Sequence, residues 1–180
     1  MNPNLVLLAL AQGLFLTNNI IFIAINGLVG LSMAPLGWMA TLPVMGYVVG
    51  GAASTSMVAR TQERYGRKVA FQIGLAVGFI SCGLCALAAL THQFWGLVFA
   101  TFVAGYYNAN AQLYRFAAAE LAPSAKEKAV SLVLAGGLIG AIMGPYIATH
   151  TKNLLDTPFA GAYVTLCVVA IVSAIVISFI

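Results

Sequence analysis

The stretch Arg60-Thr-Gln-Glu-Arg-Tyr-Gly-Arg-Lys68 holds five of the twelve charged residues of this 180-residue chain within nine positions. No charged residue occurs between Met1 and Ala59, or between Val69 and Tyr114. A charged side chain at the centre of a bilayer costs about 2.5–3.5 kcal/mol on insertion scales. Long charge-free blocks on either side of a basic cluster are therefore typical of membrane helices joined by a short loop. The sequence predicts an all-α integral membrane protein.

The composition supports this class. Hydrophobic residues make up 62% of the chain and charged residues 7%, against roughly 25% charged residues in soluble proteins. The net charge of +4 is concentrated beside the apolar blocks, so we expect the lipid bilayer as a partner and no nucleic acid. The cysteines Cys82, Cys85 and Cys167 lie inside apolar blocks, where inert packing is expected, and no metal or cofactor is predicted.

A helix needs about 20 apolar residues to cross the hydrocarbon, so 180 residues suffice for six crossings and no soluble domain. We expect a single bundle over residues 1–180 with spans at about 5–29, 38–59, 69–90, 94–118, 129–149 and 159–180. Lys and Arg residues favour cytoplasmic loops. Loops on one side hold six of them, Arg60, Arg64, Arg67, Lys68, Lys126 and Lys128, against Lys152 on the other. Both termini should therefore face the cytoplasm of a plasma membrane, as in a bacterial inner membrane.

Two spans carry stripes of polar residues. Gln12, Asn19 and Asn26 are seven residues apart in the first span, a spacing that keeps them near one helix face. The fourth span carries Thr101, Gly105, Asn108, Gln112 and Arg115 in one stripe and Tyr107, Asn110 and Tyr114 in a second. Because polar side chains are costly in lipid, we expect a water-filled substrate cavity lined by Gln12, Asn19, Asn26, Tyr107, Asn108, Gln112 and Arg115. Alternatively, the amides only tie helices together through hydrogen bonds.

Small residues mark two further spans. The second span contains Gly46, Gly50 and Gly51, and the fifth contains Gly136, Gly137, Gly140 and Gly144. Small residues let helix backbones approach closely. The order striped, small, plain occurs twice along the chain, which predicts two related three-helix repeats of the kind found in secondary transporters.

These residues resemble the Major Facilitator Superfamily, and in particular the amino-terminal six-helix half of such a transporter. The loop after the second span is similar to the family signature G-x-x-x-D-R-x-G-R-K, with Ala59 in place of the first glycine and Glu63 in place of the aspartate. The segment from Gly140 to Thr149 resembles the glycine-proline motif of antiporters in this superfamily, without its last two glycines. The fourth span keeps Gly105 of a third motif but has Thr101 where an arginine is expected.

The resemblance implies roles for particular positions. Glu63, Arg64, Gly66, Arg67 and Lys68 would form a cytoplasmic gate that holds the outward-open state, although the same loop could serve only to orient the chain. Gly140, Gly144 and Pro145 would mark a helix bend, or a packing kink without a functional step. Arg115 would bind an anionic group of the substrate or help to gate the inner mouth. The alternative is an arginine at the membrane interface that pairs with Glu120.

The predicted function is secondary active transport of a small solute by alternating access, with an exporter or antiporter as the candidate type. Transporters of this superfamily usually have twelve spans, so a second six-helix half in the same or a separate chain is an expected partner. The alternatives are a non-transporting membrane scaffold and a truncated, inactive fragment. An enzyme is not expected, since no span carries paired carboxylates, a Ser–His pair or an HExxH-like motif.

Overall fold

The computed structural model describes residues 2–151 and 159–180, and every regular element in these ranges is helical. The elements are α1 (Pro3–Met33), the short 3₁₀ helix η1 (Gly37–Thr41), α2 (Leu42–Leu90), α3 (Phe94–Ala111), α4 (Tyr114–Leu121), α5 (Lys126–Thr151) and α6 (Ala160–Ser178). Within the described residues, four stretches are long and apolar enough to cross a membrane: Pro3–Met33, Gly37–Leu90, Lys126–Thr151 and Gly161–Ser178. The predicted all-α membrane class is confirmed at this level, whereas six crossings and an internal repeat stay predictions.

The first helix has clear start and stop signals. Asn2 Oδ1 accepts a hydrogen bond from the backbone N–H of Asn4 at 3.1 Å, and Pro3 occupies the first helical position. Both features satisfy or remove amide groups that a helix start leaves unpaired. The helix ends where Ala34 becomes extended, directly before Pro35, because a residue that precedes proline disfavours helical angles.

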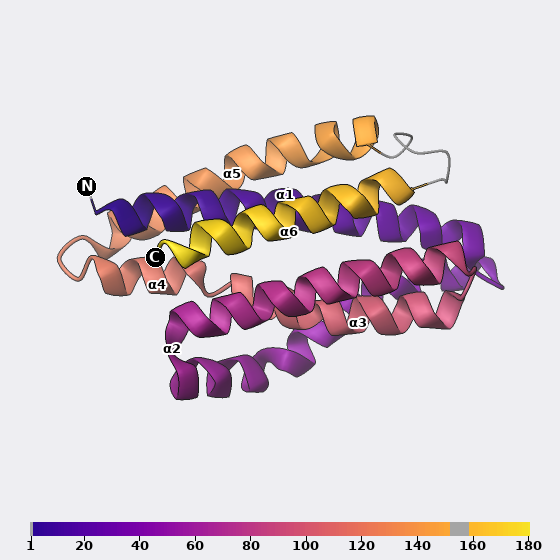
Figure 1. The fold of residues 1–180 in the computed structure, drawn as a ribbon, viewed down its shortest axis with the longest axis horizontal. Coiled ribbons are helices and arrows are strands. Elements are labelled where there is room, and N and C mark those ends of the chain that lie inside the picture. Colours follow the sequence, from indigo (N-terminus) through magenta and orange to yellow (C-terminus); the bar gives the residue numbers. More distant parts are fainter. Residues whose placement is uncertain (1, 152–158) are drawn as a thin grey trace.

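The charged stretch is mostly helical, which differs from the loop expected over residues 60–68. The residue with non-helical angles inside α2 is Gly66, at φ 79° and ψ 165°. A positive φ is costly for residues other than glycine, and one such residue is enough to reverse the chain. Figure 1 shows the two arms of α2 meeting at a sharp turn, at the same end of the bundle as both termini and α4.

The fourth predicted span, 94–118, is divided in two. Helix α3 ends at Ala111 and α4 begins at Tyr114. Between them the bonding tightens to three-residue spacing, with Leu113 N donating to Asn110 O and Phe116 N donating to Leu113 O, both at 3.1 Å. The break separates Arg115 and Glu120 from the apolar part of the span.

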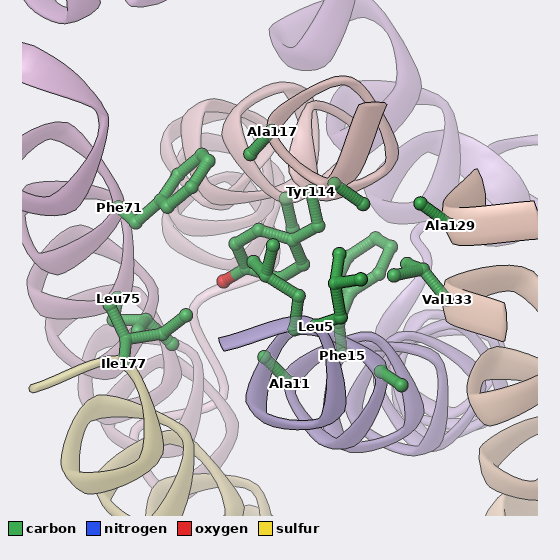
Figure 2. Packing of buried hydrophobic residues seen from close by; sticks show 14 of the residues in the cluster. Leu5, Ala11, Phe15, Phe71, Leu75, Tyr114, Ala117, Ala129, Val133 and Ile177 are labelled. Carbon is green, nitrogen blue, oxygen red and sulfur yellow. The ribbon is translucent and has the colours of Figure 1, made fainter. Parts of the chain in front are cut away.

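A core cluster joins six helices, α1 to α6, at the end that holds the termini (Figure 2). Phe15 of α1 lies edge-on to Tyr107 and Tyr114, with ring centroids 5.6 and 6.5 Å apart, and Phe71 of α2 lies edge-on to Tyr114 at 4.7 Å. Val133 of α5 and Ile177 of α6 complete the cluster, and both are fully buried. The polar contacts described below lie beside this cluster.

Glycines allow two pairs of helices to meet backbone to backbone. A Cβ atom at Gly140 of α5 would overlap the Gly13 carbonyl of α1, and one at Gly50 of α2 would overlap the Phe102 carbonyl of α3. Thr17 adds a hydrogen bond across the first crossing, from its hydroxyl to Gly140 O at 3.1 Å. The close approach expected from the small residues is therefore present at both crossings.

Candidate functional site

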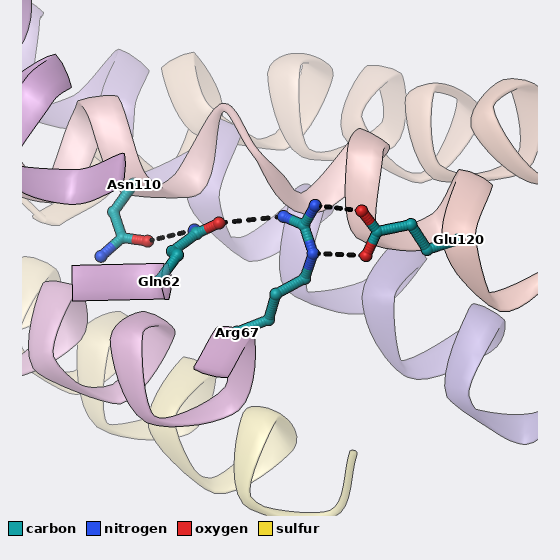
Figure 3. Close-up of polar contacts among 4 residues, drawn as sticks. All are labelled: Gln62, Arg67, Asn110 and Glu120. Atoms are coloured by element: carbon teal, nitrogen blue, oxygen red, sulfur yellow. Dashed lines mark hydrogen bonds and ion pairs between the residues drawn. The ribbon is translucent and has the colours of Figure 1, made fainter. Parts of the chain in front are cut away.

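Arg67 joins three segments of the chain through its guanidinium group (Figure 3). Its Nε and Nη2 atoms donate to the two carboxylate oxygens of Glu120, the first at 2.6 Å, and Nη1 donates to Gln62 Oε1 at 2.9 Å. Gln62 Nε2 in turn donates to Asn110 Oδ1 at 3.3 Å, and Asn110 Nδ2 donates to the Ala70 carbonyl at 2.6 Å. We call Gln62, Arg67, Asn110 and Glu120 the Arg67 cluster. A two-pronged arginine–carboxylate contact fixes direction as well as distance.

The backbone breaks described above position this cluster. Gly66 reverses α2, and the guanidinium group of Arg67 on the second arm can therefore reach Gln62 on the first arm. The separate helix α4 carries Glu120 one residue before its end. Arg67 and Glu120 are 32% and 62% exposed, so the pair is wet and contributes little net stability, about 0–1 kcal/mol for such pairs. The contact positions α4 against the turn of α2.

A cavity of about 750 Å³ opens beside the cluster. Its described lining comes from both sides of the contact: Ala59, Gln62, Glu63, Arg67, Leu113, Phe116, Ala119, Glu120, Pro123 and Lys126. Two acidic and two basic side chains line it. Because their charges are opposite, each offsets part of the desolvation cost of the others. The hydrogen bonds from Arg67 hold the pKa of Glu120 below its usual value, with the charge of Arg67 adding to the effect, so the carboxylate is ionised at neutral pH.

The neighbouring residues of the turn make different contacts. Lys68 Nζ donates to the Ser178 carbonyl at 2.7 Å, and Gln72 Nε2 donates to the Ala174 carbonyl at 2.8 Å. The first bond pairs a carbonyl at the C-terminal end of α6, where a cation is also favoured by the helix dipole, and the second reaches a carbonyl one turn earlier in the same helix. The second arm of α2 is thereby fastened to α6.

The structure places the remaining predicted gate residues on the surface. Glu63 is exposed and lines the cavity, and Arg64 is exposed with its guanidinium carbon 5.3 Å from the centre of the Tyr65 ring. In the described part of the chain, the acid that pairs with Arg67 is Glu120 and not Glu63. Glu120 therefore pairs with Arg67 and not with Arg115. A gating role for these residues stays a prediction.

The α1 stripe contacts other helices. Gln12 is buried against Gly137 of α5, and Asn26 is fully buried and accepts a hydrogen bond from the Tyr163 hydroxyl of α6 at 2.9 Å. Asn19 is half-buried, and its Oδ1 accepts from the Tyr47 hydroxyl of α2 at 2.6 Å. Asn26 Nδ2 donates to the Phe22 carbonyl, whereas the amide hydrogens of Asn19 and Gln12 have no partner in the residues that the structure describes.

The stripe on α3 and α4 varies more in exposure. Tyr107 is buried beside Phe15 and Gly78, and its hydroxyl lacks a hydrogen-bond partner among the described residues. Asn108 is half-buried near Gly51, whereas Gln112 and Arg115 are exposed. The Arg115 guanidinium carbon lies 5.2 Å from the centre of the Phe116 ring. No residue of either stripe is among the described lining residues of the cavity beside the Arg67 cluster or of a second, apolar cavity between α1, α2 and α6. A shared substrate cavity therefore stays a prediction.

The glycine-proline segment lies inside α5. Gly140 and Gly144 are buried against α1, where Gly144 packs against Ile20, and Pro145 is exposed on the other side of the helix. The helix is continuous from Lys126 to Thr151 with Pro145 inside it. The segment is thus a contact surface for α1, and a functional bend there stays a prediction.

Comparison with known proteins establishes the family. Residues 5–180 match the family model described as Major Facilitator Superfamily. The chain belongs to this superfamily. It is 33% identical over 172 residues to the riboflavin transporter RfnT of Brucella anthropi, a match that covers 94% of this chain and 43% of that protein. It is 26% identical over 124 residues to the MFS-type transporter YdeG of Bacillus subtilis, covering 68% of this chain and 29% of that protein.

Family membership and the apolar helices together identify a multi-pass membrane protein of a transporter superfamily. The resemblance read from the charged loop is therefore confirmed. The chain spans less than half the length of the riboflavin transporter that it matches.

Sequence reasoning missed several contacts of this superfamily member. Neither Gln62 nor Gln72 was singled out, although Gln62 lies inside the charged stretch, Gln72 follows it by one turn, and each has the length to reach a neighbouring helix. Asn18 was also missed: it is buried and donates to the Leu166 carbonyl of α6 at 3.0 Å. Its position beside Asn19, just off the striped face, was the available signal. Among the described residues, no group of three His, Cys, Asp or Glu side chains is placed to hold a metal ion.

Proposed function

We propose that this chain forms one half of a secondary transporter that moves a small solute across the membrane by alternating access. The observation that carries the proposal is the Arg67–Glu120 contact, which links α4 to the turn of α2 in a member of a transporter superfamily. Exposed charge pairs are weak, so rocking of helices can make and break this one at small cost. Such a two-state contact suits a gate. The transporter names of both relatives favour this function over an enzyme.

The contacts between helices support two related three-helix units. Helix α1 crosses α5 at Gly13, and α3 crosses the first arm of α2 at Gly105. Asn18 and Asn110 each stand five residues after these glycines. Their amides donate to carbonyls of α6 and of the second arm of α2, at 3.0 and 2.6 Å. Count the two arms of α2 as helices two and three, α3 with α4 as helix four, and α5 and α6 as helices five and six. Helix one then contacts helices five and six, and helix four makes the equivalent contacts with helices two and three. This is the pattern that an internal repeat produces.

A second six-helix half is the partner that this arrangement requires. Asn19 and Asn108 are half-buried and lie beside the first arm of α2. Asn19 contacts Tyr47 and Asn108 lies next to Gly51, and these two residues of α2 are one helical turn apart. Amide groups in these positions need water, a solute or another protein surface opposite them. We therefore propose that the substrate cavity forms between this bundle and the second half, with Asn19, Asn108, Gln112 and Arg115 on this side.

Riboflavin or a related heteroaromatic compound is the proposed substrate. The support is the 33% identity to a riboflavin transporter over 94% of this chain. Amide side chains that can both donate and accept hydrogen bonds suit the alternating donors and acceptors on the rim of such a ring. We propose the glycine-proline segment as a feature of export or exchange, and place the charged end of the bundle in the cytoplasm because Lys and Arg gather there.

A transport assay tests the proposal. The chain is expressed together with a second six-helix half, in the same or a separate chain, in cells that lack riboflavin uptake and export, and movement of labelled riboflavin is measured in both directions. We expect transport from the wild-type protein, a large loss with Asn108→Ala, and a smaller loss with Arg67→Lys, which keeps the charge but not the two-pronged contact. Phe99→Leu, on the exposed surface of α3, is the control and should leave transport unchanged.

Two outcomes decide between the candidate functions. Movement of another solute, found by screening labelled metabolites in the same cells, would replace riboflavin and keep the carrier function. Absence of transport for every solute tested, together with normal assembly and no effect of Asn108→Ala, would overturn the carrier proposal in favour of a non-transporting membrane scaffold.

A further inference from the structure

The structure contains a second cavity, far along the bundle from the Arg67 cluster. It has a volume of about 700 Å³ and lies between the end of α1, the end of α2 and the first half of α6. Its walls are almost entirely apolar, with Phe79, Ala86, Val164 and Ile171 among the described lining residues. This volume lies within the range of about 300–1,000 Å³ that is typical of small-molecule sites.

The polar side chains of its walls either donate their hydrogen bonds to other residues of the bundle or lie at one end of the cavity. The Tyr163 hydroxyl donates to Asn26, and the Ser32 hydroxyl donates to the Val29 carbonyl at 2.8 Å. His92 stands just after α2, at the same end as Ser32. A flavin or another solute rich in polar atoms would find its hydrogen-bonding groups unpaired along most of this cavity. The occupant should therefore be a hydrocarbon chain with any polar group near His92.

The position of the cavity matches one leaflet of a bilayer. Its walls on α6 run from Phe159 to Ile171, a separation of twelve residues or about 18 Å along a helix, against about 15 Å for half of the hydrocarbon core. Trp38 and Trp95 lie near the end that holds His92, and both are exposed, at 71% and 63%. Exposed tryptophans gather at the membrane–water interface. The His92 end is thus level with the interface, and the other end reaches toward the middle of the membrane.

The cavity is also continuous with the surface that faces lipid. Phe79, Val164 and Ile171 are lining residues and at the same time 43%, 53% and 48% exposed. We propose that this cavity is a binding site for an acyl chain of a membrane phospholipid, held between α1, α2 and α6. The site is separate from the proposed solute pathway, and the bound chain bridges helices that would otherwise leave a gap.

Mass spectrometry of the intact protein tests this site. The protein is purified in mild detergent from bacterial membranes, and retained phospholipid is measured for the wild type, Ala86→Trp and Ala76→Trp. Ala86 lines the cavity, whereas Ala76 is exposed on the same arm of α2 outside it. We expect a phospholipid to stay bound to the wild type and to Ala76→Trp, and retention to fall at least fivefold in Ala86→Trp.

A second measurement separates loss of the site from misfolding. Cys167 lines the cavity, and in a protein with Cys82→Ser and Cys85→Ser we expect an apolar maleimide to react with it several-fold faster after lipid is stripped. Adding back phosphatidylglycerol should slow the reaction again. Equal retention by Ala86→Trp and Ala76→Trp, no lipid on the wild type, or labelling that lipid does not change would each overturn the proposal. A wild-type dimer that Ala86→Trp dissociates would assign the surface to a second copy instead.

Discussion

The Tyr163 hydroxyl donates a hydrogen bond to Asn26 Oδ1 at 2.9 Å and so joins α6 to α1 in the interior of the bundle. Asn26 is completely buried and Tyr163 is 2% exposed. Asn26 Nδ2 is also satisfied, by the Phe22 carbonyl at 2.9 Å. A residue predicted to line a substrate cavity thus has a complete structural role in the arrangement described here.

A double-mutant cycle measures the worth of this contact. Asn26→Ala leaves the Tyr163 hydroxyl buried without a partner, which typically costs about 1–3 kcal/mol. We expect Asn26→Ala and Tyr163→Phe each to lower the midpoint of thermal unfolding in detergent, and the double variant to lose less than the sum of the two. Strictly additive losses would show that the two side chains do not interact across the helices.

The crossing of α1 and α5 makes a second prediction. A Cβ atom at Gly140 would overlap the Gly13 carbonyl, whereas one at Gly83 meets no atom of the described residues within 4 Å. We expect Gly140→Ala to push the helices apart, to lower the unfolding midpoint clearly and to reduce transport. Gly83→Ala is the matched control in another helix. It should be neutral or slightly stabilising, by up to about 1 kcal/mol, because alanine favours the helix over glycine. Equal effects of the two substitutions would contradict close backbone packing at Gly140.

The Arg67–Glu120 pair predicts a dependence of stability on pH. The pKa of Glu120 is lowered in the folded protein by hydrogen bonds from Arg67, so the folded state favours the ionised carboxylate. The resulting stabilisation is present above the ordinary pKa of a glutamate and is lost as the pH falls through the lowered pKa. Because both side chains are partly exposed, we expect less than about 1 kcal/mol. Chemical unfolding of the wild type and Glu120→Gln should differ at neutral pH and converge in acid. A gap that persists below the lowered pKa would point to a cause other than this charge.

Removing the hydroxyl of Tyr107 should affect stability in the opposite direction to removing that of Tyr163. Its hydroxyl is buried without a hydrogen-bond partner among the described residues, so removing the oxygen relieves a desolvation cost and leaves the ring packing on Phe15 in place. We expect Tyr107→Phe to keep or raise the unfolding midpoint, whereas Tyr163→Phe lowers it. A clear fall in stability for Tyr107→Phe would mean that a bound water or a side chain pairs with this hydroxyl in the membrane.

The helical membrane class could be predicted from the sequence because the bilayer imposes its own rule: charges are excluded from the spans and gather in the turn at Gly66. The family followed from the same turn, since its pattern of glycine, arginine and acid is distinctive. Close packing at Gly50 and Gly140 followed from the absence of side chains there. Each of these features depends on residues that are near one another in the chain.

The partners of polar residues could not be predicted in the same way. The spacing of Gln12, Asn19 and Asn26 shows that they share a helix face but not what lies opposite that face. In the structure, α5, α2 and α6 respectively lie there. Glu120 meets Arg67, 53 residues away, because α3 and α4 change direction at Leu113. Neither proline nor glycine marks this break, so no local signal was available.

The exposure of two neighbouring asparagines provides a test of the solute pathway. Asn108 is half-buried and makes no side-chain hydrogen bond within the described part of the chain, whereas Asn110 is 1% exposed and bonded to Ala70. In a protein whose native cysteines are replaced by serine, we expect Asn108→Cys and Asn19→Cys to react with a water-soluble, membrane-impermeant thiol reagent, and added substrate to slow the reaction. Asn110→Cys, on the buried side of the same helix, should stay unreactive because water does not reach it. If Asn108→Cys is as inert as Asn110→Cys under every condition, with the protein folded, the amides only hold helices together and the pathway must lie elsewhere.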